Sequence, residues 1–178
     1  MKIDRIHHVA YRCKDAKQTV EWYVNNLNMD FVLAIAEDQV PSTKDPDPYM
    51  HVFLDAGAGN ILAFFEIPTQ PEMGRDSNTP EWVQHLAFKV KDRDTLIKIK
   101  DKLEKNGIDV LGITDHSIFH SIYFFDPSGH RIELAYDDPE AGAMVKKLDA
   151  VKWEMLEEWS RTKKAPKHAA WLHEKEFS

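Results

Sequence analysis

Two histidine-led segments of this chain match each other residue by residue. The segment from His8 to Asp15 can be laid over the segment from His85 to Asp92 at a constant offset of 77, and each position keeps its character: His, aliphatic, Ala, aromatic, basic, small apolar, Lys and Asp. A single His in a strand is usually a hydrogen-bonded residue. Because both histidines head the same repeated strand, a shared role as metal ligands is favoured.

Glu133 completes the set of candidate ligands. Side chains alternate across a strand, and in both His-led segments the His, the Ala and the basic residue share the face opposite the apolar residues. Glu133 opposes Ile132 and Leu134 in the same way in a later predicted strand. A carboxylate inside a sheet cavity is costly unless it is paired, hydrogen-bonded or bound to metal, so we expect His8, His85 and Glu133 to bind one divalent ion. Two His and one carboxylate with open positions are typical of non-haem Fe(II), and Zn or Mn are alternatives.

The same alternation sorts the neighbouring residues. His7 has the opposite parity from His8, so we expect it not to be a ligand. Aligning the Gly turns of the two halves places Ala63 opposite Glu133, and the first half therefore offers no carboxylate. Three protein ligands leave coordination positions open to substrate or oxygen. Three basic residues share the face of the ligands, either to bind an acidic substrate group or as solvated strand ends: Arg12, Lys89 and Arg131.

Each His-led segment is followed by the same run of predicted elements. Asp15 and Asp92 have the character of N-caps, and the helices that they begin end at Asn28 and at Asn106-Gly107. Strands are then expected at 30–36, 50–55 and 60–67 in the first half and at 109–113, 121–126 and 130–136 in the second. Each half is a β-α-β-β-β module, which makes the fold class α+β.

These modules define the predicted domain organisation. One domain spans 1–137, with module one at 4–68, a Pro-containing linker at 69–80 and module two at 81–137. A helical extension follows at 138–178, and its helix is expected to begin at Asp138-Pro139. The apolar residues of this helix predict packing on the domain or on a second subunit.

Composition limits the partners and the location. The chain has 178 residues and a net charge of −7, with Lys and Arg scattered singly, so we expect no nucleic-acid partner. It has one cysteine, Cys13, no apolar run of membrane-spanning length and no apolar stretch near its first residue. We therefore expect a cytoplasmic protein that does not bind membranes.

Three sequence motifs resemble the vicinal oxygen chelate superfamily of glyoxalases, bleomycin-resistance proteins and extradiol dioxygenases. They are Ile-His-His-Val-Ala, Gln-His-Leu-Ala-Phe and the closing Tyr-Phe-Phe-Asp-Pro-Ser-Gly-His-Arg-Ile-Glu-Leu, and the similarity covers about residues 4–137. The resemblance implies two modules that form a half-open, eight-stranded barrel around one metal. It also implies a homodimer.

Within that superfamily the ligands resemble those of the extradiol ring-cleaving enzymes, which carry two His and one Glu. The resemblance implies Fe(II), O2 and a small catechol-like substrate, with Tyr123 near the substrate hydroxyl and His116 close to it as a second catalytic residue; His120 is a further candidate. The acid/base His of many extradiol enzymes would fall at Asn60 or Ile61, and neither can relay a proton.

Two other functions remain open. A glyoxalase-like lyase or isomerase would use the same fold with Zn, Ni or Mn, and its usual fourth ligand would fall at Ala63. A protein of the bleomycin-resistance kind would hold a ligand in the same cavity without a metal.

Overall fold

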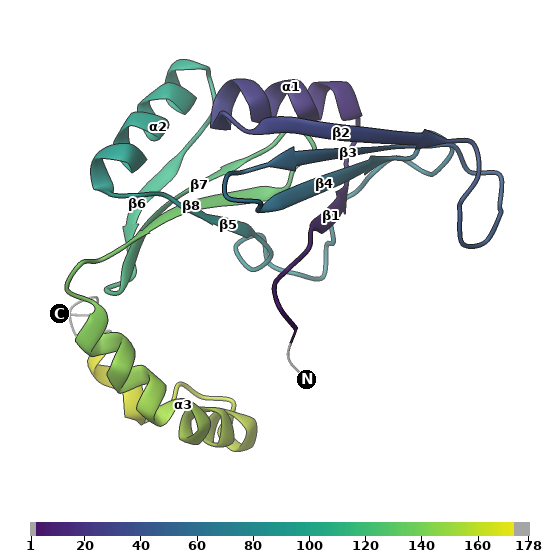
Figure 1. Ribbon diagram of the computed structural model, residues 1–178. Coiled ribbons are helices and arrows are strands. Elements are labelled where there is room, and N and C mark those ends of the chain that lie inside the picture. Colours follow the sequence, from purple (N-terminus) through teal and green to yellow (C-terminus); the bar gives the residue numbers. More distant parts are fainter. Residues whose placement is uncertain (1–2, 173–178) are drawn as a thin grey trace.

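A computed structural model describes residues 3–172 and has two four-stranded mixed sheets and three α-helices (Figure 1). The first half contains β1 (Val9–Arg12), α1 (Ala16–Leu27), β2 (Asp30–Glu37), β3 (Tyr49–Asp55) and β4 (Ile61–Glu66). The second half contains β5 (Leu86–Lys89), α2 (Arg93–Lys105), β6 (Leu111–Asp115), β7 (Phe119–Phe125) and β8 (Arg131–Asp137). A helix α3 (Gly142–Thr162) and a short 3-10 helix η1 (Lys167–Leu172) follow.

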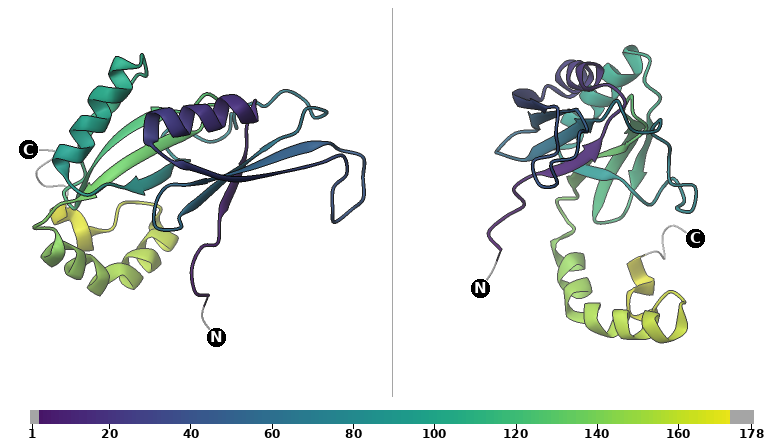
Figure 2. Two further views of the ribbon diagram at one scale, coloured as in Figure 1. Left: turned by 45° about the horizontal axis from the view of Figure 1, so that its top comes forward. Right: turned by 90° about the vertical axis from the view of Figure 1, so that its right-hand side faces the viewer.

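The two halves have the same topology, which confirms the predicted α+β fold of two modules and a C-terminal helix. The strand orders are β1-β4-β3-β2 and β5-β8-β7-β6. The parallel pairs are β1 with β4 and β5 with β8, and the other neighbouring strands are antiparallel. The sheets remain separate and do not close into a barrel. Helices α1 and α2 lie on one side of the two sheets and α3 on the other (Figures 1 and 2).

The helix ends follow the local chemistry of the sequence. The Asp15 carboxylate accepts a hydrogen bond from the backbone N–H of Gln18 at 2.7 Å, and Asp92 accepts one from Thr95 at 2.9 Å. These bonds satisfy amides that have no partner inside the first helical turn. Asn28 ends α1 with a left-handed backbone, φ 55°. Gly107 after α2 has φ 77°, where glycine carries no side-chain penalty.

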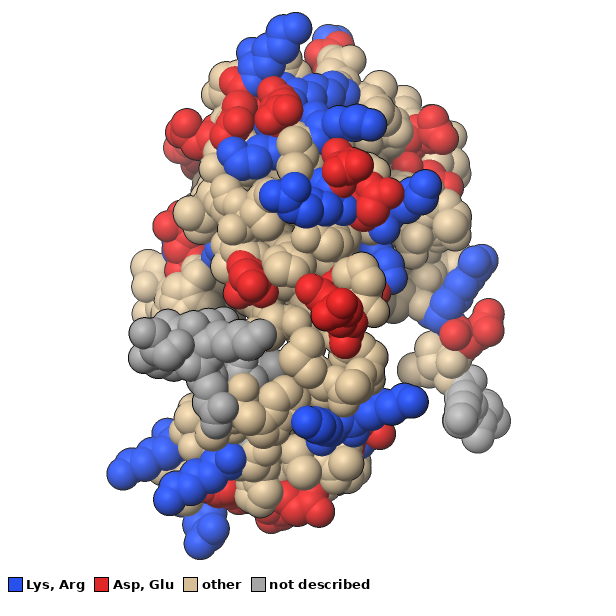
Figure 3. Space-filling view, turned by 90° about the vertical axis from the view of Figure 1, so that its left-hand side faces the viewer, with Lys and Arg blue, Asp and Glu red and all other residues tan. Residues whose placement is uncertain are grey.

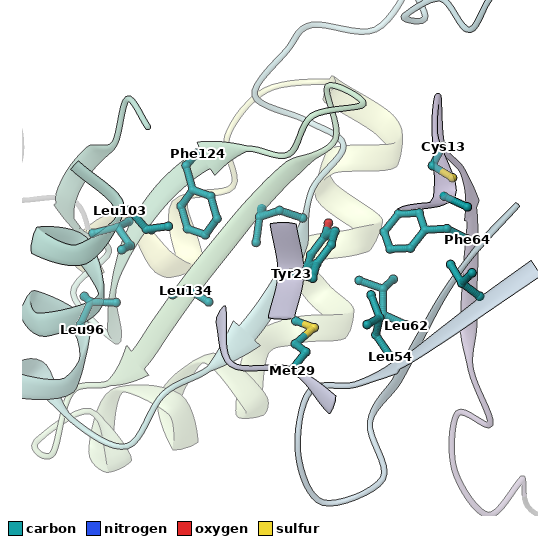
Figure 4. Close-up of a cluster of buried hydrophobic side chains, with 14 of the residues drawn as sticks. Cys13, Tyr23, Met29, Leu54, Leu62, Phe64, Leu96, Leu103, Phe124 and Leu134 are labelled. Atoms are coloured by element: carbon teal, nitrogen blue, oxygen red, sulfur yellow. The ribbon is translucent and has the colours of Figure 1, made fainter. Parts of the chain in front are cut away.

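One apolar core joins the two modules. Tyr23 of α1 lies between the apolar side chains of the first sheet, such as Phe64, and those of the second half, such as Phe124 (Figure 4). The Tyr23 hydroxyl donates to the Asp126 carboxylate at 3.0 Å, and both residues are buried. The relative position of the modules is therefore set by packing on the helix side of the sheets.

One edge of the first sheet is open. Its edge strand β2 is exposed along all eight residues, including four large apolar ones: Phe31, Val32, Leu33 and Ile35. An uncovered apolar edge strand exposes both unpaired backbone groups and hydrophobic surface.

Helix α3 begins later than the sequence predicts. The expected N-cap Asp138 instead closes a turn, in which its carboxylate accepts from the backbone N–H of Glu140 at 2.7 Å. The helix starts at Gly142 and contacts η1 rather than either sheet. On the face of the molecule in Figure 3, acidic and basic side chains are interspersed and form no continuous basic surface. None of the helices in the described part of the chain is long and apolar enough to cross a membrane.

Candidate functional site

Glu133 is a buried carboxylate whose two oxygens have different partners. It lies on β8 directly across from Tyr123 of β7, and it is 3% exposed. Its Oε1 accepts hydrogen bonds from the Ser121 hydroxyl and from the Tyr123 hydroxyl, the latter at 3.1 Å. These donors fix the orientation of the carboxylate, as the outer partners of a ligating carboxylate do.

His85 faces the other oxygen of Glu133. Its Nδ1 lies 3.0 Å from the Val83 carbonyl oxygen, which can only accept, so we assign the proton to Nδ1. The lone pair of Nε2 then points at Oε2 of Glu133 over 3.0 Å. Two lone pairs approach this closely only with a second proton on the ring or a cation beside both atoms. Donor atoms about 2.1 Å from one ion and about 90° apart lie about 3.0 Å from each other, so the pair fits a divalent metal.

Tyr123 and His116 extend this arrangement. The Tyr123 hydroxyl lies 2.9 Å from Nε2 of His116 and so connects the imidazole to the Glu133 carboxylate. Burial and the negative charge of Glu133 raise the pKa of Tyr123, which keeps its hydroxyl protonated as a hydrogen-bond donor. The structure therefore brings four of the predicted site residues together: His85, Glu133, Tyr123 and His116.

His8 lies apart from that group, in the first module. It is exposed, its Nδ1 lies 2.8 Å from Nδ1 of His7, and no hydrogen bond, ion pair or ring contact joins it to His85 or Glu133. Within residues 3–172, no three His, Cys, Asp or Glu side chains are placed to hold a metal ion. Within a single chain the structure thus brings His85 and Glu133 together but not His8.

His51 on β3 is a further candidate that was not among the residues predicted from the sequence. His51 faces His8, with ring centroids 6.3 Å apart, and its ring stacks on Phe65. It is 9% exposed, and its Nε2 is buried without a hydrogen-bond partner among the described residues. Burial, and then the charge of His8, lower the pKa of His51 and keep it neutral. Strand alternation would have found it, because His51 opposes the buried Val52.

The remaining candidates have other surroundings. His120 contacts the carboxylate of Asp138 at 3.2 Å and stacks on Tyr136 rather than approaching Tyr123. Ala63 is fully buried and lies across from Phe53, so the position aligned with Glu133 has no carboxylate in the first half.

A cavity of about 720 Å³ borders His85. Its wall also includes Arg131, His130 and Lys14, and it extends beneath the linker at 69–80. His85 therefore has an open space beside it that accommodates a small molecule.

Comparisons with known proteins place the chain in a family. Residues 5–134 match the family model of the Glyoxalase/Bleomycin resistance protein/Dioxygenase superfamily, and the chain belongs to it. MhqA of Bacillus subtilis (strain 168), named as a candidate ring-cleaving dioxygenase, is 27% identical over 146 residues, which cover 80% of this chain and 43% of MhqA. The chain thus spans less than half of that relative. YwkD of the same organism is 26% identical over 138 residues, covering 75% of this chain and 98% of YwkD.

Solved structures agree on the fold. A glyoxylase/bleomycin resistance protein/dioxygenase domain from Frankia sp. EAN1pec has a TM-score of 0.61 at 16% identity and covers 77% of this chain and 100% of its own. The fosfomycin resistance protein FosX from Listeria monocytogenes, in complex with Mn(II) and 1S,2S-dihydroxypropylphosphonic acid, has a TM-score of 0.55 at 18% identity, with 78% and 97% covered.

Proposed function

We propose that this member of the superfamily is a metal-dependent dioxygenase of the extradiol ring-cleaving type, which uses Fe(II) and O2 on a small catechol-like substrate. One observation carries the proposal: the Glu133 carboxylate is held by Ser121 and Tyr123 through one oxygen, while its other oxygen lies 3.0 Å from Nε2 of His85. An imidazole and a carboxylate, which are both metal-ligating groups, meet there, and the Tyr123 phenol and the His116 imidazole lie beside them. The similarity to MhqA supports the same reaction class.

A homodimer supplies the third ligand in this proposal. His8 of a second copy would join His85 and Glu133, because no third ligating side chain lies beside this pair within residues 3–172 of one chain. The uncovered apolar residues of β2 support such an interface, since exposed hydrophobic patches of this kind mark sites of association. His51 would enter the site together with His8.

The residues of the chain have distinct tasks in this reaction. Fe(II), when bound, supplies a centre at which a deprotonated diol and O2 meet. In the structure Tyr123 donates its one phenolic proton to Glu133, so His116 donates to the phenolic oxygen through Nε2. On substrate binding Tyr123 would turn this proton to a substrate oxygen, with His116 still donating behind it.

The chain differs from a four-ligand glyoxalase at one position. Ala63 stands where a second carboxylate would be required, and it is fully buried against the strand that carries Phe53. A lyase or isomerase would therefore have to work with three protein ligands. A metal-free binding protein would have no use for a carboxylate held as Glu133 is.

Protein purified without oxygen tests the proposal through its metal content and its oxygen uptake with a panel of catechols. We expect bound iron and uptake with at least one catechol. Tyr123→Phe should lose turnover even when metal is added to saturation, because the phenol touches substrate; it also loses one donor to Glu133 and should bind the metal roughly 10–100-fold more weakly. His116→Asn should likewise lose turnover, while the matched change His120→Asn should leave turnover unchanged, because His120 faces Asp138.

Three outcomes contradict the proposal. Protein without bound metal and without oxygen uptake would exclude the dioxygenase. Metal-loaded protein that consumes no oxygen would instead favour a lyase or isomerase. Equal loss of metal in His7→Ala and His8→Ala would contradict the assignment of His8 from strand alternation.

A further inference from the structure

Arg131 is a cation placed directly beside the Glu133 group. It precedes Glu133 by two residues on β8, so both side chains leave the same face of the strand. Its guanidinium carbon lies 4.2 Å from the centre of the Tyr123 ring, whose hydroxyl binds Glu133. The Tyr123 ring is therefore in contact with Arg131 on its face and with Glu133 through its hydroxyl, so it joins Arg131 to the proposed reaction centre.

No carboxylate of the described residues neutralises Arg131. Other basic side chains are paired: Lys89 with Asp137, and Arg75 with Glu81. The Arg131 guanidinium forms no ion pair and donates no hydrogen bond to another side chain or to the backbone within residues 3–172. The contact with the Tyr123 ring uses none of the five N–H donors of the guanidinium in a hydrogen bond.

The cavity beside His85 carries an excess of positive charge. Arg131 and Lys14 line it without carboxylate partners, and His85 and His130 add two imidazoles. Three cationic side chains, Lys14, Arg75 and Arg131, line it against two carboxylates, Asp76 and Glu81, and Arg75 pairs with Glu81. In a chain with a net charge of −7, this local surplus points to a negatively charged occupant.

We infer that Arg131 binds an oxyanion of the substrate, a carboxylate or a phosphonate, through the edge of its guanidinium. The planar fork of an Arg matches the two oxygens of such a group, which makes the residue a determinant of substrate choice rather than of metal binding. The inference rests on the proposed function for the position of the reacting ring, and it adds the substrate class: an acid rather than a neutral diol.

Equilibrium binding tests this inference without turnover. Protein purified without oxygen, with its metal content measured, is titrated with 3,4-dihydroxybenzoate, 4-methylcatechol and phenylphosphonate, and tryptophan fluorescence or heat reports binding. Arg131→Gln should raise the Kd of 3,4-dihydroxybenzoate roughly tenfold or more, as expected for loss of a charge-assisted hydrogen bond, and that of 4-methylcatechol by less than about twofold. Arg131→Lys keeps the positive charge but loses the planar pair of donors, so its Kd for 3,4-dihydroxybenzoate should lie between those of the wild type and Arg131→Gln.

Lys89→Gln is the matched control. Lys89 occupies the same face of the neighbouring strand β5, but Asp137 already takes its charge, so no binding constant should change. Thermal unfolding of all variants checks that Arg131→Gln still folds. If it does not fold, the Kd values of Arg131→Lys provide the test. If Arg131→Gln raises the Kd of phenylphosphonate but not that of 3,4-dihydroxybenzoate, the inference is supported with a phosphonate as the oxyanion.

Two results would overturn the inference: equal weakening of the acid and the neutral diol by Arg131→Gln, or no weakening of either oxyanion. Failure of the proposed function is a separate result. Protein that consumes no oxygen with any catechol, yet still prefers acids through Arg131, would refute the dioxygenase and keep the anion site.

Discussion

His8→Ala and Glu133→Gln, carried on separate copies of the chain, test whether the two modules of different subunits share one metal site. Both substitutions preserve the fold: His8 is exposed, and a Gln at 133 still accepts from Ser121 and Tyr123 through its amide oxygen. Each homodimer has a defect in both sites. Its metal affinity should fall at least about 100-fold, because the loss of an outer partner already costs roughly 10–100-fold.

The heterodimer has a different distribution of defects. If His8 of one subunit meets His85 and Glu133 of the other, one site carries both substitutions and the second site carries neither. Co-expression with two affinity tags isolates this heterodimer, which should have about half the metal content and half the oxygen uptake of the wild type. If each chain formed its own site, every site would contain one defect and no recovery would occur.

The two models therefore predict clearly different metal contents for the heterodimer. Metal content by elemental analysis and oxygen uptake should both return to about half in the heterodimer and stay near zero in the two homodimers. A heterodimer as empty as its parents would refute the shared site. A wild-type chain that sediments as a monomer at working concentration would refute it as well.

Three further predictions concern stability, reactivity and metal affinity. Tyr23→Phe removes the donor to the buried Asp126 and should lower the free energy of unfolding in urea by about 1–3 kcal/mol, whereas Tyr11→Phe should have no such effect; equal midpoints would contradict the bond between the modules. Burial raises the pKa of Cys13 to about 11, so iodoacetamide at pH 8 should alkylate the native protein far more slowly than the unfolded chain, and equal rates would contradict the burial of the thiol. Ser121→Ala removes one donor to Glu133 and should weaken metal binding roughly 10–100-fold in competition with a chelator; unchanged affinity would exclude Ser121 as a support of the site.

Strand alternation made much of the fold and half of the site predictable. The repeat predicted two like modules, and the parity rule put Glu133 on the face opposite Ile132 and Leu134, which are both buried in the core. Such inferences work because a side chain's face depends on a two-residue period that is read directly from sequence. The helix boundaries at Asp15 and Asn28 were predictable for a similar reason, since capping is local.

The placement of one module against the other was not predictable in this way. It depends on contacts between residues far apart in the chain, such as Tyr23 and Asp126, whose partnership no local pattern indicates. The start of α3 also depended on tertiary contacts, because Asp138 binds His120 and a turn amide instead of capping a helix. His51 is a different case: the parity rule predicts its face, but the resemblance to extradiol enzymes directed attention to Asn60 and Ile61.

The two halves of the repeat also explain why the proposed site has three protein ligands and not four. The cross-strand partners of Glu133 and Ala135 are Tyr123 and Ser121, which both donate to the carboxylate. In the first half the corresponding partners of Ala63 and Phe65 are Phe53 and His51. Phe53 has no donor to offer, and Ala63 is fully buried. A carboxylate at position 63 would therefore lose its hydration without the two hydroxyl donors that hold Glu133. The repeat thus supplies a His from each half but a carboxylate from one, and this asymmetry leaves coordination positions for two small ligands in the proposed reaction.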